Sequence, residues 1–190
     1  MIKKTLLILT FITLALALNS CSIFNSDPLD NDNGSLLYAQ QTGESFWILL
    51  GKDLRMDHYQ NRSEVQAKIK WYSSHKAYLE RVAKRGGPYV YYVLQQVKQR
   101  QLPSEIALLP IIESGYDPFA YSNQGAAGLW QMMPGTASGF RLRQNWWYDG
   151  RRDVYASTNA ALNYLTYLNK VFKGDWLLAF AAYNSGEGTV

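Results

Sequence analysis

Hydrophobic positions recur at helical spacing along most of the chain and predict an all-α protein. Between residues 62 and 85, apolar side chains recur every three or four positions with Lys and Glu between them. This pattern predicts one long amphipathic helix closed by Gly86-Gly87, and Pro88 is expected to start the next helix. A nearly uninterrupted apolar run from Ile106 to Ile112 then predicts a helix that is buried on most of its surface.

The second half of the chain is predicted to continue in helices around one irregular segment. Residues 125–133 are rich in glycine and alanine and are expected to be irregular or to form a short hairpin, after which Pro134 starts a helix. Gly174-Asp175 separates the last two predicted helices, the second of which covers residues 176–183. Asp153 is expected to cap the first of them, whose apolar stripe comprises Val154, Ala161, Leu165, Leu168 and Phe172.

The first residues have the pattern of a secretory signal. Lys3 and Lys4 precede an apolar run that is too short for a comfortable membrane span, so residues 1–20 are left out of the predicted fold. Residues 21–43 are polar and rich in turn formers, which predicts a flexible tether. The remaining chain is interpreted as an N-terminal helical arm at residues 44–87 and a main domain at residues 88–190.

Cys21 is the only cysteine of the chain and cannot form an intramolecular disulfide. The segment from Leu18 to Cys21 resembles the bacterial lipoprotein box, in which the cysteine is lipidated and becomes the new N-terminus. This resemblance implies an acyl anchor at Cys21, and Ser22, in the place of a retention aspartate, favours the outer membrane with the protein facing the periplasm. An ordinary signal that leaves Cys21 free is the alternative.

Charge and residue usage exclude several function classes. The chain has 19 Lys and Arg against 15 Asp and Glu, and loss of the signal leaves 17 basic side chains. No basic run indicates nucleic-acid binding, and no phosphate-binding glycine loop is present in the sequence. His58 and His75 lie outside any metal-ligand spacing, so we expect no metal and no cofactor. The length suffices for one helical domain with its own core, which we expect to be monomeric.

Glu113 is the candidate catalytic residue. It lies at the end of the buried apolar helix and is followed by Ser114 and Gly115. Burial disfavours the charged form of a carboxyl group, so a glutamate in this place can keep its proton near neutral pH and act as a general acid. The alternative is a solvated glutamate that simply ends the helix.

The segment after Glu113 offers groups suited to a sugar ligand. Gly125 and Gly128 allow the backbone to approach a ligand, while Ser122 and Gln131 supply a hydroxyl and an amide. Apolar faces for sugar rings are expected from Trp130, Met132 and Met133. Taken singly, these residues are equally explained by turns and core packing.

Three ordered motifs carry a resemblance to a known family. They are the ES pair at residues 113–114, the run AAGLWQMMPGTA at 126–137 and AYNSG at 182–186. With this order the chain resembles the lytic transglycosylases of the lysozyme superfamily, most closely their membrane-bound D group, over residues 44–190. The resemblance implies a mainly helical, lysozyme-like fold with at most a short hairpin, and a catalytic domain at residues 88–190. It also implies that more helix, often followed by LysM repeats, lies beyond Val190, so that this chain is truncated at its C-terminus.

The resemblance further implies that peptidoglycan glycan strands are the substrate. Glu113 is expected to protonate the β-1,4 bond between N-acetylmuramic acid and N-acetylglucosamine, and then to accept a proton as the 1,6-anhydromuramoyl end forms. Ser114 is expected at the helix end and cleft floor, and the remaining substrate-binding residues implied are Ser122, Gln131, Met133, Tyr183 and Asn184. Of these, Tyr183 and Asn184 are expected to hydrogen-bond around Glu113.

Residue chemistry favours a reaction with one carboxylate. Most glycosidases need two, and the only near candidate, Asp117, precedes proline and is better explained by a turn. A muramidase that uses water is the first alternative. A catalytically silent peptidoglycan-binding lipoprotein is the second, and a purely structural helical lipoprotein is the third. For Trp146 and Trp147, loop packing and a saccharide platform stay equally open.

Overall fold

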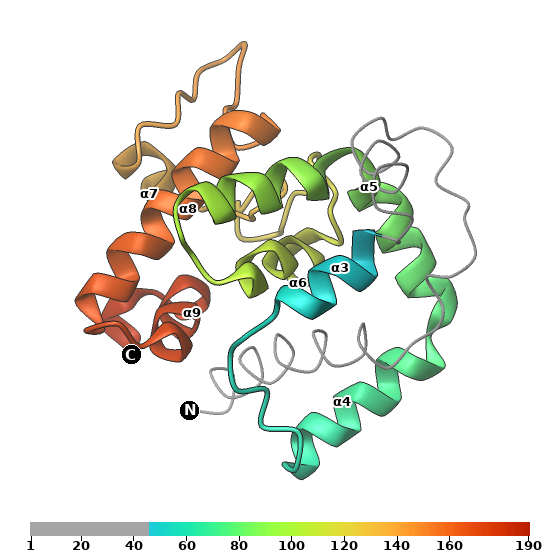
Figure 1. Ribbon diagram of the computed structural model, residues 1–190. Helices are drawn as coiled ribbons and strands as arrows, with labels where there is room; N and C mark the ends of the chain where they lie inside the picture. Colours follow the sequence, from blue (N-terminus) through green and yellow to red (C-terminus); the bar gives the residue numbers. More distant parts are fainter. Residues whose placement is uncertain (1–45) are drawn as a thin grey trace. The chain divides into compact units, whose positions relative to one another are not determined.

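A computed structural model describes residues 46–190, which fall into two compact units (Figure 1). One unit contains residues 46–116 and the other contains residues 117–190. The predicted signal at residues 1–20, the lipid anchor at Cys21 and the tether at residues 21–43 lie outside the described residues. None of the helices within residues 46–190 combines the length and apolar character needed to cross a membrane.

The unit of residues 46–116 is built from helices. They are α3 (Phe46–Asp53), α4 (Ser63–Ser74), α5 (Lys76–Gln99), the 3-10 helix η2 (Ser104–Leu108) and α6 (Leu109–Ser114). Helix α5 packs against η2, and the residues of η2 are all buried. The predicted apolar helix after Ile106 is therefore confirmed, and the structure adds that it begins as a 3-10 helix.

The long helix predicted for residues 62–85 is wrong, because the chain breaks at His75. The backbone N–H of His75 donates to the carbonyl of Tyr72 rather than continuing the α-helical ladder. Ser74 Oγ and His75 Nδ1 lie 2.8 and 2.7 Å from the carbonyl oxygen of Trp71, the acceptor that an uninterrupted helix would use. Local side-chain contacts of this kind compete with helix formation.

The predicted helix end at Gly86-Gly87 is also wrong, since α5 continues through both glycines and Pro88. The reason is the position of the glycines on the buried face. Leu79, Val82, both glycines and Val90 follow one another at helical spacing and are all buried. Burial of this continuous stripe outweighs the weak helix propensity of glycine and the backbone donor that Pro88 lacks.

In the unit of residues 117–190, helices follow an irregular segment. They are α7 (Pro134–Gly139), α8 (Val154–Val171), α9 (Trp176–Ser185) and the 3-10 helix η3 (Glu187–Thr189). Before them, isolated antiparallel bridges join Tyr121 to Ala127 and Ala127 to Met132, as expected for an irregular segment or a short hairpin. The described residues contain no extended strand, so the all-α prediction is confirmed.

The predicted helix starts in this unit are confirmed by their caps. Pro134 occupies the first turn of α7. The Asp153 carboxylate accepts from the N–H of Ala156, and the Asp175 carboxylate accepts from the N–H groups at the start of α9. Helices α8 and α9 pack together, as Figure 1 shows in orange and red, around a buried cluster of Leu168, Ala179 and Ala182.

Candidate active site

Glu113 lies in the last turn of α6, at the end of the most deeply buried stretch of its unit. Helix α6 ends because Gly115 adopts φ 61°, a left-handed conformation that glycine tolerates well. Atom Oε1 of Glu113 is buried and has no hydrogen-bond partner among residues 46–190. This burial raises the pKa of Glu113 from 4.5 to about 7. The expected desolvated carboxyl group, protonated at near-neutral pH, is thus present.

Two neighbours of Glu113 fix the end of α6. Ser114 Oγ donates to the carbonyl oxygen of Pro110 at 3.2 Å, one turn earlier in the same helix. Tyr116, which follows at φ 59°, is fully buried, and its hydroxyl donates to the carbonyl oxygen of Ala107 at 2.7 Å. Glu113 therefore lies on a short helix whose C-terminal end is hydrogen-bonded to the buried residues that precede it.

Gly86 on α5 provides the space for the Tyr116 ring. A Cβ atom at Gly86 would lie 3.1 Å from Cγ of Tyr116, closer than side chains normally approach. The glycine thus lets the ring rest almost directly on the backbone of α5. Sequence analysis assigned this glycine to a helix end, because no local pattern reveals a packing partner so far along the chain.

A second buried carboxylate, Glu105, was missed by sequence analysis. Its Oε1 accepts from the backbone N–H groups of Arg55 and Met56 at 2.5 and 2.7 Å, and His58 Nε2 lies 3.6 Å away. Burial by itself raises the pKa of Glu105, but the His58 ring and these N–H groups outweigh it and lower the pKa below 4.5. Glu105 is thus a charged residue that fastens the segment after α3 onto η2, in contrast to Glu113.

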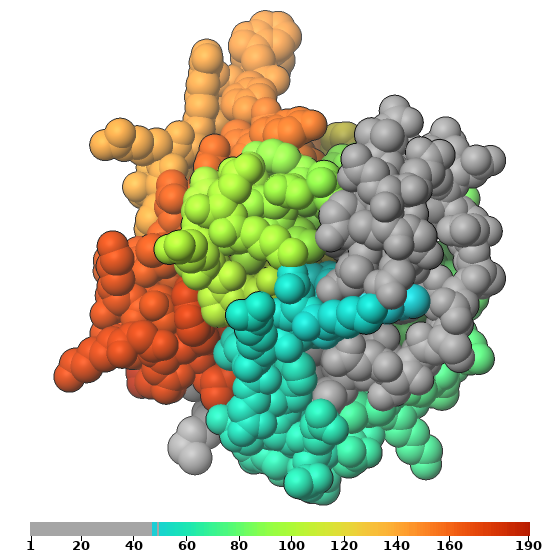
Figure 2. Space-filling view, viewed as in Figure 1, coloured from blue at the N-terminus to red at the C-terminus, as the bar shows by residue number. Residues whose placement is uncertain are grey.

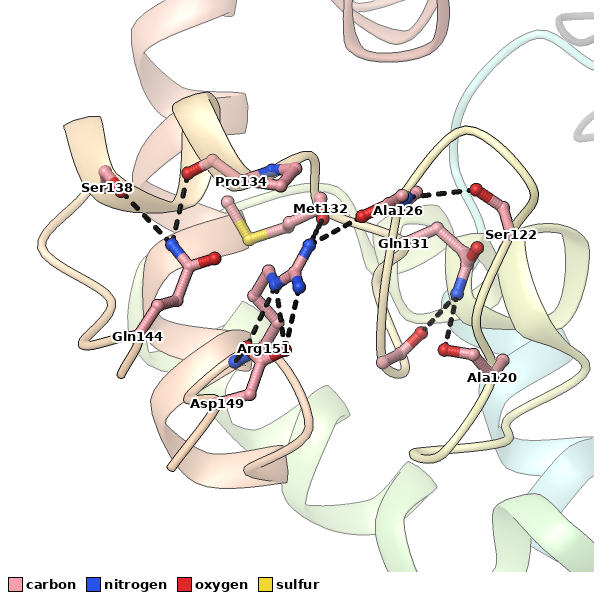
Figure 3. A network of polar contacts seen from close by, with 12 residues as sticks. Ala120, Ser122, Ala126, Gln131, Met132, Pro134, Ser138, Gln144, Asp149 and Arg151 are labelled. Atoms are coloured by element: carbon pink, nitrogen blue, oxygen red, sulfur yellow. Dashed lines mark hydrogen bonds and ion pairs between the residues drawn. The ribbon is translucent and has the colours of Figure 1, made fainter. Parts of the chain in front are cut away.

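The glycine-rich segment, taken here as residues 120–133, holds three of the predicted substrate-binding residues: Ser122 and Gln131, labelled in Figure 3, and Met133. Ser122 Oγ accepts from the N–H of Ala126 at 3.0 Å, and Gln131 Nε2 donates to the carbonyls of Ala120 and Gly128 at 3.3 and 2.9 Å. Figure 3 shows the Gln131 side-chain oxygen directed away from these two carbonyls. Met133 is 44% exposed. The segment is therefore fixed by its own side chains, while the side chain of Met133 is exposed at its surface.

Arg151 holds this segment together and was not predicted. Its guanidinium donates to the Asp149 carboxylate, to the carbonyl of Gly125 at 2.7 Å and to that of Met132 at 3.3 Å (Figure 3). Gly128 lies against the same residue, since a Cβ there would be 1.7 Å from the Arg151 carbonyl oxygen. With φ at 79°, Gly128 meets both a conformational and a steric requirement for glycine.

Two expected sugar-contacting residues belong to the core instead. Trp130 is fully buried and donates from Nε1 to Thr158 Oγ1 at 3.0 Å, and Met132 is 2% exposed. Neither can stack on a sugar, so this expectation is wrong for both. The alternation of the segment turns their side chains inward and leaves the side chain of Met133 outward.

Tyr183 and Asn184 lie near the end of α9, in the same unit as the glycine-rich segment. The Tyr183 hydroxyl donates to the carbonyl oxygen of Trp130 at 2.8 Å, and its ring lies 5.4 Å from that of Tyr164. Asn184 is exposed. The structure therefore links Tyr183 to the residue next to Gln131, whereas Glu113 and Ser114 belong to the other unit.

Glu113 is the side chain of this region that can act as a proton donor. Asp117, the alternative carboxylate, accepts at Oδ1 from the N–H of Phe119 at 2.9 Å, as expected for a turn residue. Within residues 46–190, no group of three or more His, Cys, Asp or Glu side chains is placed to hold a metal ion. Glu113 can donate its proton near pH 7 and, once ionised, accept one back.

Comparison with known proteins gives the same family as the motifs. Residues 92–190 match the transglycosylase SLT domain. The chain is 50% identical over 144 residues to "Membrane-bound lytic murein transglycosylase D" of Escherichia coli K12, a match covering 76% of this chain and 32% of that protein. It is 52% identical over 106 residues to "Putative tributyltin chloride resistance protein" of Alteromonas sp. M-1, covering 56% of this chain and 51% of the relative.

A more distant relative is "Putative soluble lytic murein transglycosylase" of Haemophilus influenzae, 33% identical over 81 residues, or 41% of this chain and 14% of that protein. The chain spans about a third of the length of transglycosylase D. The domain match extends over more than half of the chain and contains Glu113, the glycine-rich segment and Tyr183. The chain therefore belongs to the transglycosylase SLT domain family.

Proposed function

We propose that the protein is a peptidoglycan lytic transglycosylase in which Glu113 acts first as an acid and then as a base. The observation that carries the proposal is the buried Oε1 of Glu113, with a pKa raised to about 7. A carboxyl group with this pKa holds a proton at working pH and still releases it readily. Membership of the transglycosylase SLT domain family supports the choice of substrate.

In the proposed reaction, Glu113 gives its proton to the oxygen that links N-acetylmuramic acid to N-acetylglucosamine. As the bond from this oxygen to C1 breaks, the muramoyl acetamido group stabilises C1. The Glu113 carboxylate then takes the proton of the C6 hydroxyl, and the C6 oxygen bonds to C1. The products are a free N-acetylglucosamine hydroxyl and a 1,6-anhydromuramoyl end, and no water is consumed.

The decisive experiment replaces Glu113 with Gln and follows digestion of purified cell wall by mass spectrometry. General acid–base assistance contributes about 100- to 10,000-fold in rate, so Glu113→Gln should lose at least that much activity. Glu80→Gln, an exposed change on α5, is the matched control and should retain activity. Undiminished turnover by Glu113→Gln would refute the assignment.

The same digest separates the alternatives. A transglycosylase releases fragments with anhydro ends, whereas a muramidase releases fragments that are heavier by one water. A silent binder releases neither, although it is retained on cell wall. The muramidase alternative would be supported if the unmodified protein gave only the heavier product.

Ser114 is proposed to support the cleft floor, while Ser122, Gln131, Met133, Tyr183 and Asn184 are proposed to contact the substrate. Met133 allows a clean test, because its side chain is 44% exposed and its removal leaves the core intact. Met133→Ala should raise KM several-fold with a smaller effect on kcat. Leu178→Ala, at 40% exposure on α9, is the control and should leave KM unchanged.

The chain is further proposed to be a monomer with an N-terminal helical arm at residues 44–87 and its catalytic domain at residues 88–190. The family match over residues 92–190 supports this domain, although α5 continues across the proposed boundary. A single species of monomer mass in light scattering is expected. A dimer at micromolar concentration would contradict the monomer.

Anchoring through lipid at Cys21 in the outer membrane, facing the periplasm, completes the proposal. It is supported by the sequence around Cys21 and by the words "membrane-bound" in the name of the transglycosylase D relative. Cys21→Ser should move the protein from the outer-membrane to the soluble fraction and abolish incorporation of labelled fatty acid. Ser26→Ala is the control, and membrane retention of Cys21→Ser would argue against the anchor.

A further inference from the structure

The loop between α7 and α8 exposes two adjacent tryptophans. Trp146 is 82% exposed and Trp147 is 85% exposed, more than any other large hydrophobic side chain among the described residues. Figure 2 shows this segment, in orange, standing out from the surface of its unit. Single exposed hydrophobic residues need no explanation, but two neighbouring indoles that contribute nothing to the core indicate a binding surface.

Hydrogen bonds hold the loop in one conformation. Asn145 Oδ1 accepts from the N–H groups of Trp147 and Tyr148 at 3.0 and 2.9 Å, and the Asn145 N–H donates to the Tyr148 carbonyl at 2.8 Å. Gln144 Nε2 donates to the Pro134 carbonyl and to Ser138 Oγ on α7, both at 3.1 Å (Figure 3). Because the loop is already ordered, a ligand does not have to fix it on binding.

Beside the indoles lies an open cleft of about 500 Å³. Its lining combines three aromatic side chains with amide, carboxylate and guanidinium groups: Asn145, Trp146, Trp147, Tyr148, Asp149, Arg152 and Asp153. The polar groups are oriented, since the Tyr148 hydroxyl donates to Asp153 Oδ2 at 2.9 Å. A few fixed polar groups among aromatic faces are typical of small-molecule sites, and the volume lies in their range of roughly 300–1,000 Å³.

This lining fits an oligosaccharide better than a membrane. A pyranose ring offers an apolar face to an indole and a rim of hydroxyls to carboxylates and amides. The cleft has no excess of basic charge that would attract anionic lipids, since Asp149 and Asp153 offset Arg152 and the ion-paired Arg151. The two indole rings lie 4.8 Å apart with planes at 67°, so they cannot both stack on one sugar ring. Two stacking faces in different directions favour a ligand of several sugar units.

We propose that the loop of residues 144–149, with Arg152 and Asp153, is a glycan-binding site that holds strands of N-acetylated amino sugars. The identity of the strand as peptidoglycan rests on the proposed function. The stacking site itself requires only the exposed indoles and the cleft.

The test measures binding separately from cleavage. In a Glu113→Gln background, the Trp146→Ala/Trp147→Ala protein should bind purified sacculi at least tenfold more weakly than the parent. Trp71→Ala removes another exposed tryptophan, 44% exposed on α4, and should bind like the parent. The trimer of N-acetylglucosamine should change the tryptophan fluorescence of the parent and of Trp71→Ala but not of the double variant.

Two further measurements keep the result decisive. Trp146→Phe/Trp147→Phe retains aromatic faces and should recover most of the sacculus binding, which a misfolded loop would not allow. Unchanged sacculus binding by the double alanine variant would overturn the proposal. Binding to vesicles of phosphatidylethanolamine and phosphatidylglycerol is measured in parallel. The proposal would also be overturned if the double alanine variant lost binding to these vesicles but kept its binding to sacculi. Cleavage that survives Glu113→Gln would refute the proposed mechanism without affecting these binding results.

Discussion

Replacing Glu113 with Gln should stabilise the protein at neutral and alkaline pH and leave its stability unchanged near pH 4. Burial raises the pKa of Glu113 from 4.5 to about 7, so the folded protein keeps a proton that the unfolded chain has already released. Between these two values, the free energy of unfolding therefore falls as pH rises. Glutamine is neutral at every pH and does not have this dependence.

The size of the effect follows from the same pKa change. One pKa unit corresponds to about 1.4 kcal/mol, so a rise from 4.5 to about 7 costs the folded state at most roughly 3.5 kcal/mol once the carboxyl group is ionised. The cost begins near pH 4.5, grows to about pH 7 and then stays constant. Glu113→Gln should be more stable than the parent by this amount at pH 8.

Urea unfolding of both proteins at intervals from pH 4 to pH 8 measures the difference directly. Glu80→Gln changes an exposed glutamate on α5 and should show no comparable pH-dependent gain. A gap between Glu113→Gln and the parent that does not change with pH would refute the argument. So would a gap of the opposite sign at pH 8, because that would mean that the ionised carboxylate is stabilised in the folded protein.

Other predictions follow from the same structure. Activity should fall as pH rises through about 7, because only protonated Glu113 can act as the acid, and a pH profile of kcat that stays flat to pH 9 would contradict this. Gly128→Ala should destabilise the protein by more than about 3 kcal/mol, since its Cβ would meet the Arg151 carbonyl oxygen at 1.7 Å; Gly135→Ala, which has open space, should change stability by less than about 1 kcal/mol in thermal melts. Glu105→Ala should lower the free energy of unfolding by roughly 3 kcal/mol, because the backbone N–H groups of Arg55 and Met56 lose their acceptor; urea unfolding at pH 7 measures this. The cost should shrink as pH falls below 4.5, where the lowered pKa of Glu105 no longer favours the folded protein, and a constant cost down to pH 2 would disagree.

Local patterns predicted the parts of the fold that are decided locally. The cap at Asp153, the break at Gly174-Asp175 and the helix end at Gly115 were visible in the sequence, because each depends on neighbours within one or two helical turns. The break at His75 was missed although it is also local. It depends on contacts of the Ser74 and His75 side chains with the Trp71 carbonyl oxygen, and the spacing of apolar residues gives no information about such contacts.

What sequence analysis could not predict depends on partners far along the chain. The course of α5 through Gly86 follows from a ring that belongs to Tyr116, and Trp130 is fully buried and bonded to Thr158. Arg151 was overlooked because two of its acceptors are main-chain carbonyls, which have no signature in the sequence. Arg151 and Glu105 are both charged side chains that the structure buries, and no local pattern in the sequence indicates that burial.

Because Gly86 has no side chain, a substitution at this position could change the pKa of the proposed catalytic acid, Glu113, without touching it. A methyl group there would push the Tyr116 ring by a few tenths of an ångström, and Tyr116 follows Glu113 by only three residues through the Gly115 turn. Such a displacement would loosen the apolar environment of the carboxyl group and bring its acidity back toward that of an ordinary glutamate. An engineer could thus shift the pH dependence of the proposed reaction from a different helix, without altering any residue proposed to contact the substrate.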